Sequence, residues 1–392
     1  MPIDWKSPRA SYIVLDVDGV QFDFFRDYHV AIDLLAPGGQ FDFAASLIPG
    51  KRGVRQTLGA KGLAAGRKVH LQLVTPYGTT LQHTGRIYDV EYELTRKSGS
   101  TIHAVVRDHM HPIVHADAVP SMALDGSTLS DVFLRVLAPF GYAANAITID
   151  SDAARDLMTG RPASGVTLSK QAPINLEAYK VDQALPNPGE NAFGFLSRHA
   201  RRFGLIIWGT ADGRVILGRP NYTQKPRYTF LAKGGFKGVA NNVKSVRRRL
   251  SMSQRPSEVH VYGKTFGGDF SRSSVHEVVY DDEVRATGIF APITVHDGNA
   301  RDASQAKERG QYELGKRRQT GDVVQVQLAR HCHRDGTVYA IDTVAEVQFD
   351  AGEVDSTMYV VKRAFSCSQL AGSETALDLV RKNSIVLGEG AR

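Results

Sequence analysis

The segment that decides the fold runs from Pro188 to Leu217 and reads PGENAFGFLSRHARRFGLIIWGTADGRVIL. Its first part predicts a helix that Gly204 stops, because apolar residues recur there at helical spacing. These apolar residues are Phe193, Leu196, Ala200 and Phe203. Its second part predicts two short strands joined at Asp212-Gly213, a pair that supplies the positive φ of a tight turn. The same pair recurs at residues 18–19 and 335–336, again between β-like runs.

The two ends of the chain predict β-structure. In the first 110 residues, Tyr12–Val17 is an apolar run and Arg67–Thr75 alternates between apolar and polar side chains. Runs of this kind, separated by Gly, Pro and Ser, are typical of a barrel or sandwich. Strands recur from Val239 onward, one of them over Thr337–Thr343, whereas Asn221–Gly238 reads as a loop.

Two more helices are predicted. The first follows a cap at Ser127 or Thr128 and ends before Pro139 and Gly141. Its single apolar face comprises Leu129, Val132, Phe133, Val136 and Leu137. The second spans Ala303 to about Arg318 and is mostly charged, which predicts a surface connector.

A weak internal repeat links the two β ends. A strand ending near Tyr92, the sequence Lys97-Ser98-Gly99-Ser100, and a strand ending at Val106-Arg107 form its first copy. A strand ending near Phe365, the sequence Leu370-Ala371-Gly372-Ser373, and a strand ending at Val380-Arg381 form the second. The spacing differs by one residue, so one β unit is predicted to occur twice.

The composition is that of an ordinary globular protein. The chain has 392 residues, of which 42% are hydrophobic and 23% charged, and its net charge is +7. It contains no apolar run long enough for a membrane helix, and Met1–Ala10 lacks the apolar core of a signal peptide. The two cysteines, Cys332 and Cys367, are too few for a four-cysteine metal site, and synthesis in a reducing cytoplasm predicts no disulfide.

One stretch offers an enzymatic alternative. Tyr12–Val20 reads YIVLDVDGV and resembles the first motif of the haloacid-dehalogenase phosphatases. The resemblance implies that one of Asp16 and Asp18 attacks phosphorus, with the other as general acid and Mg²⁺ nearby. That fold continues with helices alternating with parallel strands, whereas Val20–Leu35 continues as β. A hairpin turn at Asp18-Gly19 therefore accounts better for these residues.

Other candidate sites have structural explanations. His109, His111 and His115, with Asp108, resemble a metal cluster, but Pro112 interrupts any strand there. His331-Cys332-His333 reads as a hairpin tip, because only two of its side chains would share a face. Gly263-Lys264-Thr265 lacks the earlier glycine of a phosphate loop, since Glu258 occupies that position.

Three basic clusters are present, and none is interleaved with the aromatic residues that stack on bases. We expect them on the outer surface or at subunit interfaces rather than along a DNA channel, because phosphate contacts add binding strength. They comprise Arg198, Arg201 and Arg202; Arg247, Arg248 and Arg249; and Lys316, Arg317 and Arg318.

The order of motifs resembles the Mu-type tail protein P family, the baseplate hub proteins of contractile-tailed phages. The decisive part is the Pro188–Leu217 segment, with an acidic-capped helix ending in Arg-x-x-Gly, then a strand, an Asp-Gly turn and a strand. Val17–Val20, Gly85–Val90 and Met358–Val361 are similar to other elements of that family.

The resemblance implies a mainly β fold with an α+β middle, in which two tube-like antiparallel β-barrels flank an inserted α/β region. The expected boundaries are residues 1–110 for the first barrel, 111–235 with a connector at 285–320 for the middle domain, 236–284 with 321–388 for the second barrel, and 389–392 for a tail.

It also implies a structural role without catalysis, so no catalytic residue, cofactor or metal is expected. Three chains would present six similar barrels and adapt a six-fold tail tube to a three-fold central spike. Expected partners are further copies of the chain in a homotrimer, a hexameric tube protein, the trimeric spike and other baseplate proteins. DNA would pass through the ring without specific binding. The chain would be assembled in the host cytoplasm and reside in the virion tail baseplate, with no membrane anchor.

Overall fold

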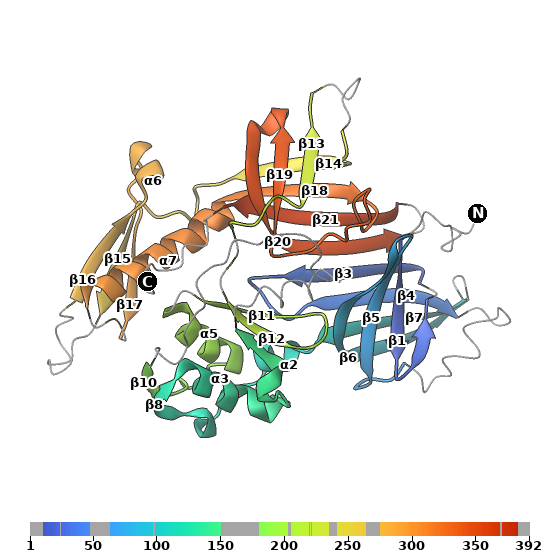
Figure 1. The fold of residues 1–392 in the computed structure, drawn as a ribbon, viewed down its shortest axis with the longest axis horizontal. Coiled ribbons are helices and arrows are strands. Elements are labelled where there is room, and N and C mark those ends of the chain that lie inside the picture. The colour runs from blue at the N-terminus through green and yellow to red at the C-terminus, as the bar shows by residue number, and fades with distance from the viewer. Residues whose placement is uncertain are drawn as a thin grey trace.

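Strands dominate the protein, and helices gather in the middle of the chain and in one insertion (Figure 1). The computed structural model describes residues 11–23, 25–47, 63–96, 99–149, 180–202, 205–218, 220, 222–234, 241–263, 275–298, 300, 302–368 and 371–382. The predicted fold class, mainly β with an α+β middle, is confirmed. Within these residues, no helix is both long and apolar enough to cross a bilayer.

The first module consists of antiparallel strands. They are β1 (Tyr12–Val17), β2 (Val20–Phe22), β3 (Asp27–Asp33), β4 (Gln40–Leu47), β5 (Lys68–Thr75), β6 (Gly78–Thr95) and β7 (Gly99–Asp108). The predicted turn at Asp18-Gly19 joins β1 to β2, with φ of +51° and +87° at its two residues. Alternation places Val69, Leu71 and Leu73 of β5 in the core.

The second module repeats this arrangement. Its strands are β13 (Tyr228–Ala232), β14 (Ser245–Leu250), β18 (Asp322–Ala329), β19 (Thr343–Phe349), β20 (Val354–Ser368) and β21 (Gly372–Arg381), with a short turn of helix at Asp350–Gly352. The pairing order β14-β18-β21-β20-β19-β13 matches β3-β4-β7-β6-β5-β1 strand for strand. The one difference in direction is that β13 pairs parallel with β19, whereas β1 pairs antiparallel with β5.

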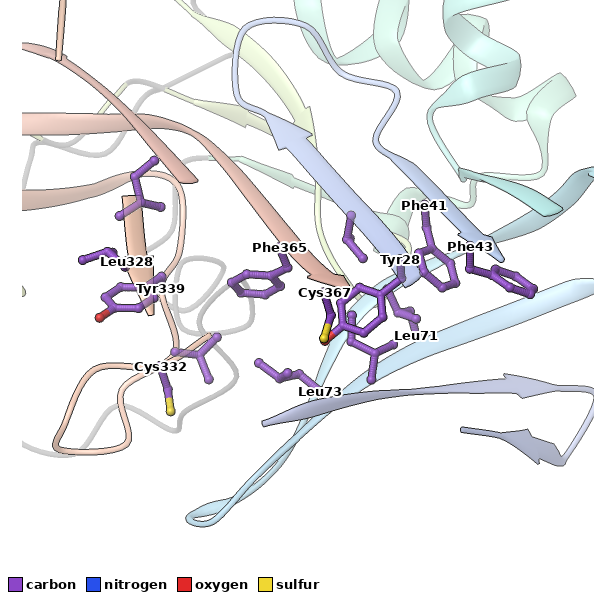
Figure 2. Close-up of a cluster of buried hydrophobic side chains, with 14 of the residues drawn as sticks. Tyr28, Phe41, Phe43, Leu71, Leu73, Leu328, Cys332, Tyr339, Phe365 and Cys367 are labelled. Carbon is purple, nitrogen blue, oxygen red and sulfur yellow. The ribbon is translucent and has the colours of Figure 1, made fainter. Parts of the chain in front are cut away.

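The two modules share one sheet. The second half of β20 pairs antiparallel with β3, so the red and blue strands lie side by side in Figure 1. Strands β14, β18, β21, β20, β3, β4, β7 and β6 thus form a continuous run, which we call the long sheet. A single core also crosses this junction, where Phe365 and Cys367 of β20 lie near Tyr28 of β3 (Figure 2).

The middle region lies between the modules in sequence. It contains α2 (His111–His115), a 3-10 turn at Pro120–Met122, β8 (Leu124–Thr128), α3 (Leu129–Leu137), 3-10 turns at Ala138–Phe140 and Ala144–Ala146, β9 (Ile147–Ile149), β10 (Lys180–Ala184), α5 (Ala192–Arg202), β11 (Ile206–Gly209) and β12 (Val215–Gly218). Helix α3 begins as predicted, because Thr128 and Asp131 form a capping box. All five residues of its predicted apolar face are buried.

An insertion separates β14 from β18. It comprises β15 (Glu258–Gly263), β16 (Val275–Tyr280), α6 (Asp282–Ala286), β17 (Pro292–Asp297) and α7 (Ala303–Gly321). Helix α7 packs on β15 and β16 over a core of its own. Gly310 makes this approach possible, since a Cβ there would lie 2.6 Å from Cγ2 of Val279.

Several expectations from the sequence were wrong in detail. The segment with β15 and β16, expected in the second barrel, instead forms a separate sheet in which β15 pairs with both β16 and β17. The segment Asn221–Gly238, expected to be a loop of the middle domain, contains β13, which pairs with β19 of the second module. The predicted strand Thr337–Thr343 is mostly irregular, because Asp342 has a φ of +55°, and β19 begins only at Thr343. Phe203 and Gly204, the predicted helix end, and the tail at 389–392 lie outside the described residues.

Candidate functional site

The two aspartates of the phosphatase alternative maintain a turn. Oδ1 of Asp16 accepts a hydrogen bond of 2.8 Å from the backbone N–H of Gly19, and Asp18 forms an ion pair with Arg67. Strand β1 is antiparallel to both of its neighbours, β2 and β5. A phosphatase of that family needs parallel neighbours joined by helices, so the structure contradicts this alternative.

The histidines around Asp108 do not form a cluster of ligands. The Asp108 carboxylate accepts hydrogen bonds from the backbone N–H groups of Gly39, Met110 and His111, at 2.6, 3.0 and 3.0 Å. Nε2 of His109 lies 3.1 Å from the carbonyl oxygen of Arg214. Among the described residues, no three His, Cys, Asp or Glu side chains are placed to hold a metal ion. Asp108 therefore fixes the end of β7 to the loop after β3.

The segment His331-Cys332-His333 is mostly buried. Nε2 of His331 lies 2.7 Å from the Tyr28 hydroxyl, and its Nδ1 lies 3.2 Å from Oγ1 of Thr375. Burial lowers the pKa of His331 to about 3. The imidazole is thus a neutral link between the modules rather than an exposed metal ligand.

The third candidate from the sequence, at residues 263–265, is only partly described. Gly263 ends β15, and a Cβ there would lie 2.3 Å from the carbonyl oxygen of Ala300, so close packing explains this glycine. Lys264 and Thr265 lie outside the described residues.

Four of the nine clustered cations form ion pairs with carboxylates of the same chain, within its described residues. Arg198 donates to both carboxylate oxygens of Glu190, and Arg248 donates to both of Asp322. Arg317 and Arg318 pair with Glu313 and Asp281, respectively, while Arg201 lies over the ring of Tyr312. Arg247 and Arg249 differ from these, because they lie exposed on β14.

The Pro188–Leu217 segment packs the middle region against the second module. Glu190 holds Arg198 of α5 and also accepts from the backbone N–H of Asn187. Trp208 and Ile216, on the hairpin β11–β12, are buried against Tyr359 and Val361 of β20. Asp212 in the turn binds Thr210 and Arg214. The segment is therefore structural.

One face of the long sheet is polar, and we call it the polar face. Side chains alternate between the two sides of a strand, so the polar face carries the residues that point away from the hydrophobic core. Its acidic residues are Asp27, Asp33, Asp42, Asp89, Glu91, Glu93, Glu374 and Asp378. Its basic residues are Arg86, Arg107, Arg247, Arg249 and Lys362. Acidic groups thus outnumber basic ones on this face, although the chain is basic overall.

This face was not foreseen from the sequence. A hollow in it is lined by Asp27, Asp42, Asp89 and Glu91, which come from three strands of the first module. The readable signal was the alternation of acids at 89, 91 and 93. Which other strands share the face depends on long-range pairing.

The fold matches those of solved phage tail proteins. A tail protein from Neisseria meningitidis is 19% identical, with a TM-score of 0.73 over 96% of this chain and 99% of that one. The 43 kDa tail protein of prophage MuSo2 from Shewanella oneidensis is 19% identical, with a TM-score of 0.72 over 96% and 99% of the two chains. An Escherichia coli component of the type VI secretion system, described as similar to bacteriophage T4 tail proteins, is 9% identical, with a TM-score of 0.54 over 94% and 76%. The sequence matches no protein-family model and no curated protein.

These similarities extend over nearly the whole chain, so they include both modules, the middle region and the insertion. The chain therefore has the fold of solved phage tail proteins, as its motifs predicted.

Proposed function

We propose that this chain is a structural subunit of a phage-type tail, the baseplate hub. Three copies form a ring between a six-fold tail tube and a three-fold spike. The role requires no catalysis, which agrees with the structural contacts of Asp16, Asp108 and His331. The other expected partners are further baseplate proteins, and the expected location is the virion tail, after assembly in the host cytoplasm.

The observation that carries this proposal is the duplication of the module. Two modules with the same strand order lie side by side in one sheet. Three chains therefore supply six similar units, which a symmetric contact with six tube subunits requires. The middle region and the insertion occur once per chain and supply three-fold features.

The charge of the polar face supports its assignment to the bore. A surface along which DNA slides should not bind phosphates, because each phosphate contact adds affinity. The polar face carries more carboxylates than cations, and one of its cations, Lys362, lies opposite Asp33 in the strand pairing. Two others, Arg247 and Arg249, are exposed on β14. DNA passage without specific binding follows from this assignment.

Light scattering and electron microscopy test the ring. The purified chain should have three times its monomer mass and show a central hole, and it should co-sediment with a hexameric tube protein. A chain that stays monomeric at high concentration and ignores tube protein contradicts the proposal. Strong, salt-dependent DNA binding would contradict the assignment of the polar face to the bore.

A further inference from the structure

We infer that a small cavity where the two modules meet the middle region binds one monovalent anion of the size of chloride, between Arg363 of β20 and His83 of β6. The cavity has a volume of about 30 Å³. Its walls come from β3, β6, the end of β7, the hairpin β11–β12 and β20, together with Ile341 before β19. Such a site lies within one chain, so it does not depend on the proposed ring.

Arg363 is a buried cation whose partners are all neutral. It is 3% exposed. Its Nη1 donates to Oε1 of Gln82 and to the carbonyl oxygen of Tyr339, each over 2.9 Å, and its guanidinium group lies 4.1 Å from the ring centroid of Phe365. Burial lowers the pKa of Arg363 to about 10, so the group is still charged at neutral pH. Burying a charge costs much free energy unless the charge is paired, so Arg363 requires a counter-ion.

Two buried nitrogen atoms at the cavity lack partners. Nε of Arg363 and Nε2 of His83 are both buried, and neither has a hydrogen-bond partner among the described residues. The Nε of a guanidinium group always carries a hydrogen, so it is an unsatisfied donor. Burial, followed by the positive charges of His109 and Arg363, lowers the pKa of His83 to about 3, so its ring is neutral and has one N–H to donate. An anion between the two groups accepts from both and supplies the missing charge.

A bulge in β6 brings these groups to one side. The pairing of β5 with β6 shifts its register between Leu71 and Gln72, which leaves Gln82 as an extra residue in β6. Neighbouring side chains of a regular strand point to opposite faces, whereas Gln82 and His83 are each only 3% exposed. Bulges re-aim side chains in this way. The bulge thus provides both an acceptor for Nη1 of Arg363 and a second donor for the anion.

Asp108 reaches the cavity but does not neutralise Arg363. Its two oxygens already accept hydrogen bonds from backbone N–H groups, one from Gly39 and the other from Met110 and His111. Among the described residues, Asp108 and Arg363 do not approach within the 4.0 Å of an ion pair. The N–H groups hold the carboxylate in place and stabilise its charge, so the cation remains without a direct counter-charge.

The size of the cavity selects the anion. Holding one water molecule takes about 10–15 Å³ on this measure, so the cavity has room for about two particles of that size. Chloride is only slightly larger than water, whereas phosphate, sulfate and carboxylates exceed the space. Water alone would satisfy the two N–H groups but leave the charge of Arg363 unbalanced. The remaining space fits one water, which can donate to Nδ1 of His109, a buried acceptor without a partner among the described residues.

The dependence of stability on the anion tests the site. A ligand that binds only the folded state stabilises it as the ligand concentration rises. At equal ionic strength, the melting temperature should be about 2 °C or more higher in sodium chloride than in sodium gluconate, whose anion is too large for the cavity. Arg363→Met should abolish this difference. Arg248→Met removes an arginine that is already paired with Asp322, so it is the matched control and should retain the difference.

Anomalous scattering tests the position of the anion and needs no variant. Wild-type crystals soaked in sodium bromide should show an anomalous peak in the cavity, in contact with Nε of Arg363 and Nε2 of His83. A cavity that holds only water in bromide would overturn the assignment, as would equal melting temperatures in the two salts or a difference that Arg363→Met retains. Neither measurement requires assembly, so a negative result leaves the proposed ring unaffected.

Discussion

The two modules have the same strand order, yet matching positions have opposite surroundings. Phe365 of β20 is fully buried, packed against the ring of His331 and under the guanidinium group of Arg363. Tyr92, at the matching position of β6, is 47% exposed. Among the described strands, β3 pairs along the second half of β20, whereas β5 pairs along β6 only as far as Arg86. The comparison teaches that two modules with the same strand order differ where they meet, because the contact between them buries a residue in one module and leaves its counterpart exposed in the other.

The modules also differ in the connection that follows the matching strands β3 and β14. In the first module, β3 leads to β4 through the short segment 34–39. In the second, the insertion with α7 and its own sheet occupies the corresponding place between β14 and β18. The module thus accepts a large addition at a loop without a change in its pairing order, as loops generally do.

The largest effect should come from truncating the two matching aromatic residues. Phe365→Ala should lower the free energy of unfolding by about 3–5 kcal/mol, because it leaves a cavity in the core shared by the modules. Tyr92→Ala should cost about 1 kcal/mol, mostly from the lost hydrogen bond of its hydroxyl to the Leu63 carbonyl oxygen. Denaturant unfolding of the monomeric form measures both, and equal losses would show that the two edges are not different in the isolated chain.

The next effect tests how the insertion is attached. The Asp281 carboxylate is fully buried and pairs with Arg255 and Arg318, so it ties the end of β16 to α7. Asp281→Asn should cost about 3 kcal/mol, since it removes the buried counter-charge of Arg255 and leaves that cation only the exposed carboxylate of Glu283. The neighbouring exposed carboxylate offers a matched control, and Asp282→Asn should cost under about 0.5 kcal/mol. Hydrogen exchange should show faster opening of β16 and α7 in the first variant and unchanged modules.

A smaller effect should appear as acid sensitivity at the module junction. Burial lowers the pKa of His331 to about 3, so the folded protein keeps this imidazole neutral where the unfolded chain binds a proton. The unfolded state therefore takes up the extra proton between about pH 6.5 and pH 3, and stability falls as pH is lowered through this range. The contribution of His331 approaches about 1.4 kcal/mol per pH unit.

His331→Gln should reduce that slope, measured as the free energy of unfolding against pH from 4 to 8. His29→Gln, which removes an exposed imidazole from β3, is the control. An unchanged slope in the His331 variant would mean that this residue is protonated, or exposed, in the folded protein.

The sequence predicted local elements well, because their signals are local. The positive φ at Asp18-Gly19 and the capping box at Thr128 follow from short-range chemistry, and both turn and helix are confirmed. Strand β13 was missed, because its partner β19 lies more than a hundred residues away in the chain and pairs in parallel. The irregular stretch at Thr337–Thr343 resembled a strand, because its apolar residues are buried without strand pairing.

The polar face could be predicted only in parts. Alternating acids at Asp89, Glu91 and Glu93 and the arginine run at 247–249 are visible in the sequence. That they lie on one continuous sheet depends on the pairing of β20 with β3, which joins Phe365 to Val30 across most of the chain. Long-range pairing of this kind leaves no periodic signal, so only the structure could connect the parts.

The smallest effect should come from Asp16→Asn. Asp16 has no core contact to lose, and its one described bond, to the N–H of Gly19, can be replaced by the amide oxygen of asparagine. We expect a cost under about 1 kcal/mol and an assembly state like that of wild type, because asparagine keeps the hydrogen bond that holds the turn. Light scattering and denaturant unfolding measure this, with a phosphatase assay in Mg²⁺ alongside. We expect no phosphatase activity, since the two antiparallel neighbours of β1 leave a nucleophilic carboxylate without the surroundings that its chemistry needs. A Mg²⁺-dependent phosphatase activity that this substitution abolishes would overturn the assignment of Asp16 to a turn.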